Sequence, residues 1–159
     1  MHSRIFQISD KPIEKSDYIN ETHYWDHWFV DRIADYVSDE TDRESDIEWL
    51  KSCYEYVDMT FGKDEGGEYF IINDKTKYFA KHFEEFHKAA VELSQIKLDD
   101  FVNRRYSASL YRLKGADDDE FGFYVEWGSE GGTDTFDGFM RYAEVGVKYY
   151  IGATIDYHW

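Results

Sequence analysis

The chain has 159 residues, of which 42% are hydrophobic and 19% aromatic, and it carries 18 Lys and Arg residues against 34 Asp and Glu residues. This length suits one domain, residues 1–159, with a core that needs no disulfide, and the single Cys53 excludes an internal one. The net charge of −16 repels phosphate and anionic lipid, which argues against direct binding to nucleic acid or membrane. Without a signal peptide or an apolar run of roughly 18 residues, we expect a cytoplasmic protein.

The first third of the chain predicts a short strand followed by two helices. Residues 3–9 are β-prone and favour a strand at the edge of a sheet. After Asn20, a good N-cap, aromatic and aliphatic residues recur at three-to-four spacing and predict a helix over 20–38. The capping box that begins at Ser45 predicts a second helix, which runs to about Met59.

The middle of the chain contains the clearest helical pattern. A turn over 63–67 precedes a short strand over 68–72, and Asp74 can cap the helix that follows. That helix, over 75–95, is predicted by an apolar stripe made of Phe79, Phe83, Phe86, Ala90 and Leu93. A further helical turn is expected over 98–102.

The last third predicts a hairpin, a short helix and a final strand. The hairpin joins residues 106–113 to the alternating segment 121–127, with four acidic residues, Asp117 to Glu120, at its tip. A Gly-rich loop over 128–134 and a helix over 136–143 follow.

The final strand, residues 145–159, is expected to form the backbone of the sheet. Its odd positions are apolar or aromatic and its even positions mostly polar, which is the alternation of a strand with one buried face. Because it is about three times the usual strand length, we expect it to bend, and Gly152 is the natural place.

Together these elements predict a single α+β domain in the order β-α-α-β-α-β-β-α-β. The strands gather toward the end of the chain, which favours an antiparallel or mixed sheet with the helices packed on one face.

The sequence patterns that could indicate a metal-binding or phosphate-binding site are weak. His23, His27 and Asp31 follow one another at intervals of four, which would align them on a helix, but the residue after His23 is Tyr and a solvated face explains the spacing. The acidic tip lacks the spacing of a calcium loop. The Gly128–Gly132 loop lacks the Lys of a phosphate loop, and its Glu130 would repel phosphate. We therefore expect no metal and no cofactor.

Two sets of residues remain as candidate binding sites. The first is an acidic band between residues 31 and 48, whose proposed contact residues are Asp31, Asp35, Asp39, Glu40, Asp42 and Glu44. Its carboxylates could imitate nucleic-acid phosphates, and interface-prone aromatics, Trp25, Trp28, Tyr36 and Trp49, flank it. The second, the polar-face set, is the even side of the last strand with its neighbour: Tyr124, Glu126, Tyr150, Asp156 and His158. A Tyr, a His and carboxylates on one sheet face can exchange protons, although such a face is also the ordinary solvent side of a sheet.

The leading functional hypothesis is a non-enzymatic module or inhibitor that binds a protein with a basic surface, for example a nucleic-acid-binding enzyme. Its basis is the charge of −16 together with the absence of any catalytic motif. The alternatives are a small-molecule-binding or hydrolytic domain that uses the polar-face set, and an acidic immunity protein against a basic toxin. The sequence does not fix the oligomeric state.

Overall fold

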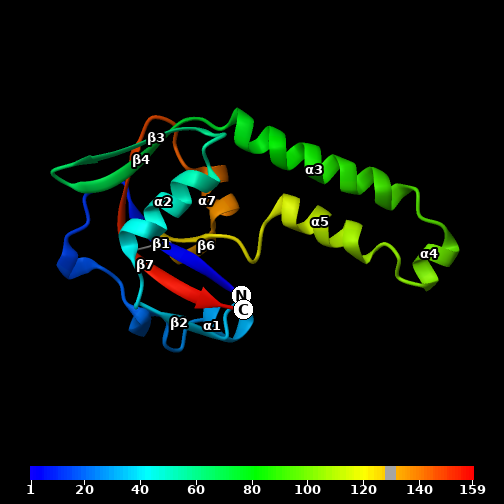
Figure 1. Cartoon of the computed structure of the whole chain (residues 1–159), viewed down its shortest axis with the longest axis horizontal. Coiled ribbons are helices and arrows are strands. Elements are labelled where there is room, and N and C mark those ends of the chain that lie inside the picture. The colour runs from blue at the N-terminus through cyan, green and yellow to red at the C-terminus, as the bar shows by residue number, and fades with distance from the viewer. Residues whose placement is uncertain (128–131) are drawn as a thin grey trace.

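The computed structural model describes residues 1–127 and 132–159 and shows an α+β domain built on one mixed sheet (Figure 1). The strands are β1 (His2–Ser9), β2 (Tyr36–Ser38), β3 (Asp58–Asp64), β4 (Gly67–Asp74), β5 (Tyr124–Trp127), β6 (Gly132–Thr135) and β7 (Lys148–His158). The helices are α1 (Phe29–Arg32), α2 (Arg43–Cys53), α3 (Thr76–Ser94), α4 (Leu98–Val102), α5 (Ser107–Asp117) and α7 (Phe136–Tyr142), with 3-10 turns at Lys15–Asp17 and Glu21–Tyr24. The predicted fold class is confirmed.

The sheet is organised around β7, as the alternating sequence predicted. The strand order is β3-β4-β7-β1-β5-β6, and β2 pairs with the last residues of β7. All pairs are antiparallel except β1 with β5. The first strand is therefore central and not at the edge, because β7 and β5 pair with its two sides.

A bulge at Gly152 bends β7 where the sequence predicted a bend. Along β1 and β7, Phe6 pairs with Thr154 and Ile8 with Ile151, so two residues of β7 oppose the single Gln7 of β1. Because side chains alternate across a strand, the extra residue reverses the facing of everything that follows it. The buried odd positions of β7 therefore serve two cores on opposite faces of the sheet.

Each face of the sheet has its own core. Tyr149 and Ile151 belong to the larger core, with residues of α2, α7 and the start of α3. Ile155 and Tyr157 belong to the smaller core on the opposite face, which Tyr24 and Phe29 cover. The sequence predicted only one apolar face because it could not show the reversal at the bulge.

Replacing Gly152 with Ala is expected to lower the free energy of unfolding by about 1–2 kcal/mol. The new Cβ would lie 2.5 Å from Oε1 of Gln7, and this oxygen already accepts hydrogen bonds from the backbone N–H groups of Ala153 and Ile19 (both 3.1 Å). Gly115→Ala in α5 is the control. A Cβ at this position meets nothing within 4 Å, and the substitution should stabilise the protein because it removes a glycine from the interior of a helix. Urea unfolding should show opposite signs for the two variants, and a neutral Gly152→Ala would contradict the tight fit at the bulge.

The predicted helix over 20–38 is wrong. Asn20 does act as a cap, but of the short turn Glu21–Tyr24, and the chain then passes through left-handed conformations at Asp26 (φ 59°) and Asp31 (φ 86°). Tyr24 and Phe29 are 1% and 0% exposed in the smaller core. Two residues five apart point about 140° apart on an α-helix, so burying both forces the chain out of that conformation.

The second helix exists but begins and ends earlier than predicted. Asp42 is its N-cap, accepting a hydrogen bond from the Ser45 backbone N–H at 3.2 Å, so the capping box at Ser45 is wrong. The helix ends at Cys53, and residues predicted as its last turn and the following loop form β3, which pairs with β4. The predicted strand over 68–72 lies inside β4.

The predicted hairpin is also wrong, because residues 107–117 form α5 and not a strand. This helix packs against α3, where Ser109 donates a hydrogen bond to Glu92 at 2.7 Å. The helices α3, α4 and α5 form an arm, residues 76–117, that extends away from the sheet (Figure 1). The predictions for α3 and α4 are confirmed, but only the start of α3 reaches the core.

The end of the chain follows its predictions more closely. The strand β5 is shorter than the predicted 121–127, and the predicted helix over 136–143 is α7, capped by Thr135. Of the predicted loop over 128–134, residues 128–131 lie outside the described residues, and the rest belongs to β6.

Within the part of the chain that the structure describes, no helix is long and apolar enough to cross a membrane.

Candidate interaction surface

The acidic band runs along the chain from α1 through β2 to the start of α2. All six proposed contact residues are exposed. Asp31 is in α1, and Asp35, Asp39 and Glu40 flank β2, an extended segment that advances roughly 3.3 Å per residue. Asp42 and Glu44 begin α2. The fold thus converts a contiguous acidic sequence into an exposed row of carboxylates.

Most of this negative charge is not used to hold the fold together. Asp42 caps α2 by accepting hydrogen bonds from the backbone N–H and the hydroxyl of Ser45, and these bonds lower the pKa of its carboxyl. Asp35 lies 3.3 Å from Nδ1 of His158. Within residues 1–127 and 132–159, the side chains of Asp31, Asp39, Glu40 and Glu44 make no hydrogen bond or ion pair. These four carboxylates are therefore available to a partner.

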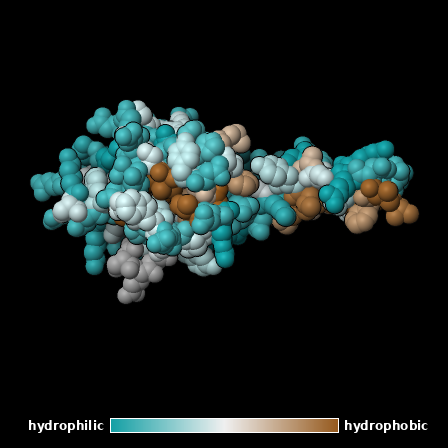
Figure 2. Space-filling view, turned by 90° about the horizontal axis from the view of Figure 1, so that it is seen from below, coloured by the Kyte–Doolittle hydropathy of each residue, from teal (hydrophilic) through white to brown (hydrophobic). Residues whose placement is uncertain are grey.

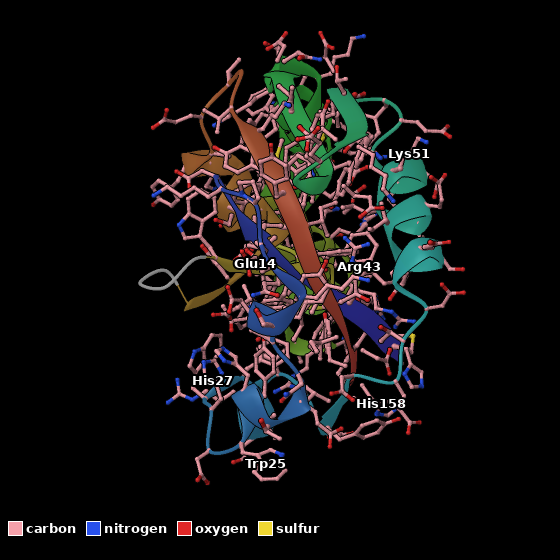
Figure 3. The ribbon with its side chains drawn as sticks, turned by 90° about the vertical axis from the view of Figure 1, so that its left-hand side faces the viewer. Glu14, Trp25, His27, Arg43, Lys51 and His158 are labelled. Atoms are coloured by element: carbon pink, nitrogen blue, oxygen red, sulfur yellow. The ribbon has the colours of Figure 1, made fainter. Side chains whose placement is uncertain are left out.

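The four aromatic residues predicted to flank the band are all strongly exposed. Trp25 is 69% exposed, Trp28 46%, Tyr36 47% and Trp49 40%. Figure 3 shows Trp25 at one end of the molecule, outside the sheet. Tyr36 is held in place by stacking on His158, with ring centroids 5.2 Å apart. Large exposed aromatics are enriched at protein interfaces, so their occurrence with free carboxylates in one stretch of chain makes residues 25–49 a candidate interaction surface.

Not every acidic residue of the segment belongs to this surface. Asp46 is 4% exposed and accepts hydrogen bonds from Arg4 Nε (2.7 Å) and Thr154 Oγ1 (2.8 Å). Arg4 also donates to Asp156, which fixes α2 against β1 and β7. This buried network is structural.

The structure does not bring the polar-face set together. Because of the bulge at Gly152, Asp156 and His158 face the side of the sheet that carries α2, as their β1 partners Arg4 and His2 do. Tyr124, Glu126 and Tyr150 face the opposite side. The OH of Tyr150 donates to Asp64 at 3.2 Å, and Tyr124 is 2% exposed in the smaller core. No common site can use all five residues.

Glu126 borders a cleft of about 430 Å³ between β5 and the segment after β1, whereas Tyr124 lines a separate groove of about 410 Å³. It is 6% exposed and accepts hydrogen bonds from Thr133 Oγ1 (2.5 Å) and Tyr24 OH (3.4 Å). Nε2 of His23, which also lines the cleft, lies 3.3 Å from the carboxylate. Burial, followed by the nearby Glu126 charge, raises the pKa of Tyr24. The arrangement gives Glu126 enough partners to be stable without a ligand.

His23, His27 and Asp31 do not form a metal site. They do not share a helix, and the rings of His23 and His27 are 6.1 Å apart while His23 turns toward Glu126. Across the described ranges, no three His, Cys, Asp or Glu side chains are arranged to hold a metal ion.

One polar cluster was missed by the sequence analysis. Asp137, 5% exposed in α7, accepts hydrogen bonds from the OH of Tyr78 and from the backbone N–H of Asp119 (2.7 Å). His82 stacks on Tyr78, with centroids 4.5 Å apart, beside a cavity of about 180 Å³. Burial raises the pKa of Asp119, one of the residues predicted at the acidic tip. The cluster joins the root of the arm to α7, and no sequence spacing indicated it because its members lie far apart in the chain.

Searches against protein-family models, curated proteins and solved structures found no match to this chain, so its residues and geometry are the basis on which a function is inferred.

Proposed function

We propose that this chain is a non-enzymatic, cytoplasmic protein that binds a partner protein with a basic surface through the acidic band. The observation that supports this most is the combination, within residues 25–49, of free, exposed carboxylates with four exposed aromatics. Carboxylates in a row attract a cationic partner over a distance, and aromatics supply the desolvated contacts that hold it.

A nucleic-acid-binding protein is the sharpest form of this proposal. Such proteins carry Lys and Arg arranged to meet phosphates at regular intervals, and an extended acidic segment such as that around β2 presents carboxylates in a comparable row. A basic toxin neutralised by this chain would use the same surface. The two forms differ in the partner and not in the residues of this chain that bind it.

The proposal predicts salt-sensitive capture of a basic protein. The chain, immobilised by a tag, is incubated with a lysate of its source cells at low ionic strength and then washed at about 1 M salt, where the Debye length falls to roughly 3 Å. We expect a protein of high isoelectric point to be retained at low salt and released by the wash. If only acidic or neutral proteins are retained, or if nothing is, the proposal is wrong.

A further inference from the structure

The arm has a different surface from the rest of the chain. Residues 76–117 contain eight Lys and Arg residues and six Asp and Glu residues. The rest of the chain contains ten Lys and Arg residues and 28 Asp and Glu residues. The strong acidity therefore belongs to the body of the protein, and the arm is nearly neutral. In Figure 2 the arm projects from the body, with hydrophobic side chains near its far end.

The apolar stripe of α3 is only partly covered. Phe79, Phe83, Phe86, Ala90 and Leu93 follow one another at intervals of four, three, four and three, which is the heptad spacing of a helix that pairs with another helix. Yet Phe83 is 68% exposed and Phe86 36%. Phe79 packs against the larger core, and Ala90 and Leu93 are half-buried, so the exposed part of the stripe is centred on Phe83 and Phe86.

The helix α5 leaves the Phe83 side of the stripe uncovered, because it packs on a neighbouring side of α3. The buried Ala89 and the half-buried His82 face α5, where His82 Nδ1 lies 3.2 Å from the carbonyl oxygen of Ala116. On an α-helix these positions point roughly 60–80° away from the centre of the stripe. A groove of about 480 Å³ lies at this same contact, and Ala89, Ala116 and the charged Glu85, Lys88 and Arg112 line it. The side of α3 that carries Phe83 is therefore different from the side that faces α5.

Both ends of the arm add exposed apolar surface. At the tip, Leu98 is 79% exposed, Phe101 58% and Val102 69%. At the root, next to the start of α3, Tyr142 is 84% exposed, and Lys75 Nζ donates to the carbonyl oxygen of the adjacent Arg141 at 3.3 Å. Monomeric proteins rarely leave so much apolar surface in one region.

We infer that the arm pairs with the arm of a second copy of this chain, antiparallel, about a two-fold axis near residue 88. This arrangement sets Phe86 of each copy opposite Ala90 of the other, and Phe83 opposite Leu93, so large side chains face small ones and interdigitate. Because α3 ends at Ser94, the residues that follow it in one copy lie beside the beginning of α3 in the other. The apolar tip of each arm then meets the root of the other, close to Tyr142. This inference does not depend on the proposed function.

Charge selects a second copy over a basic partner for this surface. A basic protein would bind the acidic body and not the nearly neutral arm. Two arms, in contrast, can approach each other with little electrostatic repulsion. With 19 residues, α3 is about 28 Å long, so antiparallel arms hold the two acidic bodies apart by more than the Debye length of about 8 Å. Two α3 helices about 10 Å wide over this length present roughly 600 Å² in total, and contacts between each tip and the opposite root add to it, which is the size of a weak, reversible interface.

The test is the mass in solution by sedimentation equilibrium over a wide concentration range. We expect the 19.0 kDa chain to give a reversible dimer, and Phe83→Glu to weaken its association about 100-fold or more by placing a charge in the seam. Trp25→Glu is the matched control, because Trp25 is equally exposed (69%) but lies on the body, and its dimer should be unchanged. Circular dichroism checks that α3 and α5 remain helical in each variant.

A mixing experiment tests the geometry. Phe83→Lys and Leu93→Glu should each be monomeric, and their equimolar mixture should form a heterodimer, because the axis sets these positions opposite each other. A wild-type chain that remains at 19.0 kDa up to its solubility limit would overturn the inference. So would a dimer that survives Phe83→Glu, one that is lost with Trp25→Glu, or a mixture that stays monomeric.

Discussion

Replacing Arg4 with Met is expected to lower the free energy of unfolding by about 3 kcal/mol, which corresponds to roughly 6–12 °C in melting temperature for a domain of this size. The side chain of Arg4 is only 20% exposed, and those of its partners Asp46 and Asp156 are 5% and 14% exposed. Two buried carboxylates that lose their shared cation repel each other and cannot regain water.

The position of this network explains the size of the effect. Arg4 lies on β1, Asp156 on β7 and Asp46 on α2, so the guanidinium joins the two central strands to the helix that covers them. Its guanidinium also lies 5.5 Å from the centre of the Trp49 ring. Removing it weakens the attachment of α2, whose Ile47 and Leu50 contribute to the larger core.

Urea unfolding monitored by circular dichroism measures this prediction. Arg32→Met is the matched control, because Arg32 is exposed, and it should change the stability by less than about 0.5 kcal/mol. The triple variant Arg4→Met, Asp46→Asn, Asp156→Asn removes the repulsion as well and should recover most of the loss. If Arg4→Met costs no more than Arg32→Met, the network is not what holds α2 in place.

Sequence patterns that extend over many residues predicted the corresponding strand and helix correctly. The alternation in β7 and the apolar stripe of α3 were read correctly because each extends over many residues, and Gly152 was identified as the bend from strand length alone. What these patterns could not show is the environment of each face. The α3 stripe was expected to pack on the sheet, and most of it instead lies on a projecting arm.

The failures occurred where distant contacts override local preference. Residues 20–38 have helical spacing, but the burial of both Tyr24 and Phe29 in the smaller core decides their conformation. Residues 106–113 alternate small polar with apolar side chains, and such a short pattern fits either a strand or a helix. Packing against α3 selects the helix.

The candidate sites differ in how far the sequence could anticipate them. The acidic band was predictable because it is contiguous, and its exposure follows from its charge. The polar-face set depended on constant alternation along β7, which one inserted residue at the bulge destroys. The Asp137 cluster joins residues far apart in sequence, and no spacing reveals it.

Neutralising the acidic band is expected to weaken binding to the basic partner by roughly 30- to 100-fold. Five carboxylates are changed, Asp31→Asn, Asp35→Asn, Asp39→Asn, Glu40→Gln and Glu44→Gln, while Asp42 is kept because it caps α2. Exposed ion pairs contribute about 0.3–1 kcal/mol each, and five of them together give about 2–3 kcal/mol. Because all five are exposed, the fold should remain intact.

A control with the same change in net charge separates a binding surface from general acidity. Five exposed carboxylates outside the band are neutralised instead: Asp10→Asn, Glu14→Gln, Glu55→Gln, Glu65→Gln and Glu84→Gln. Both variants have the same total charge, so long-range attraction is reduced equally in both. Any further loss of affinity for the basic partner in the band variant therefore comes from contacts that the acidic band itself makes.

The most direct measurement of the central claim is the Kd of the basic protein retained at low salt, determined by calorimetry for the wild type and these two variants. We predict a loss of at least about 30-fold for the band variant and less than about threefold for the control. Equal losses in both variants would contradict the claim, because the acidity of this chain would then act only through its total charge.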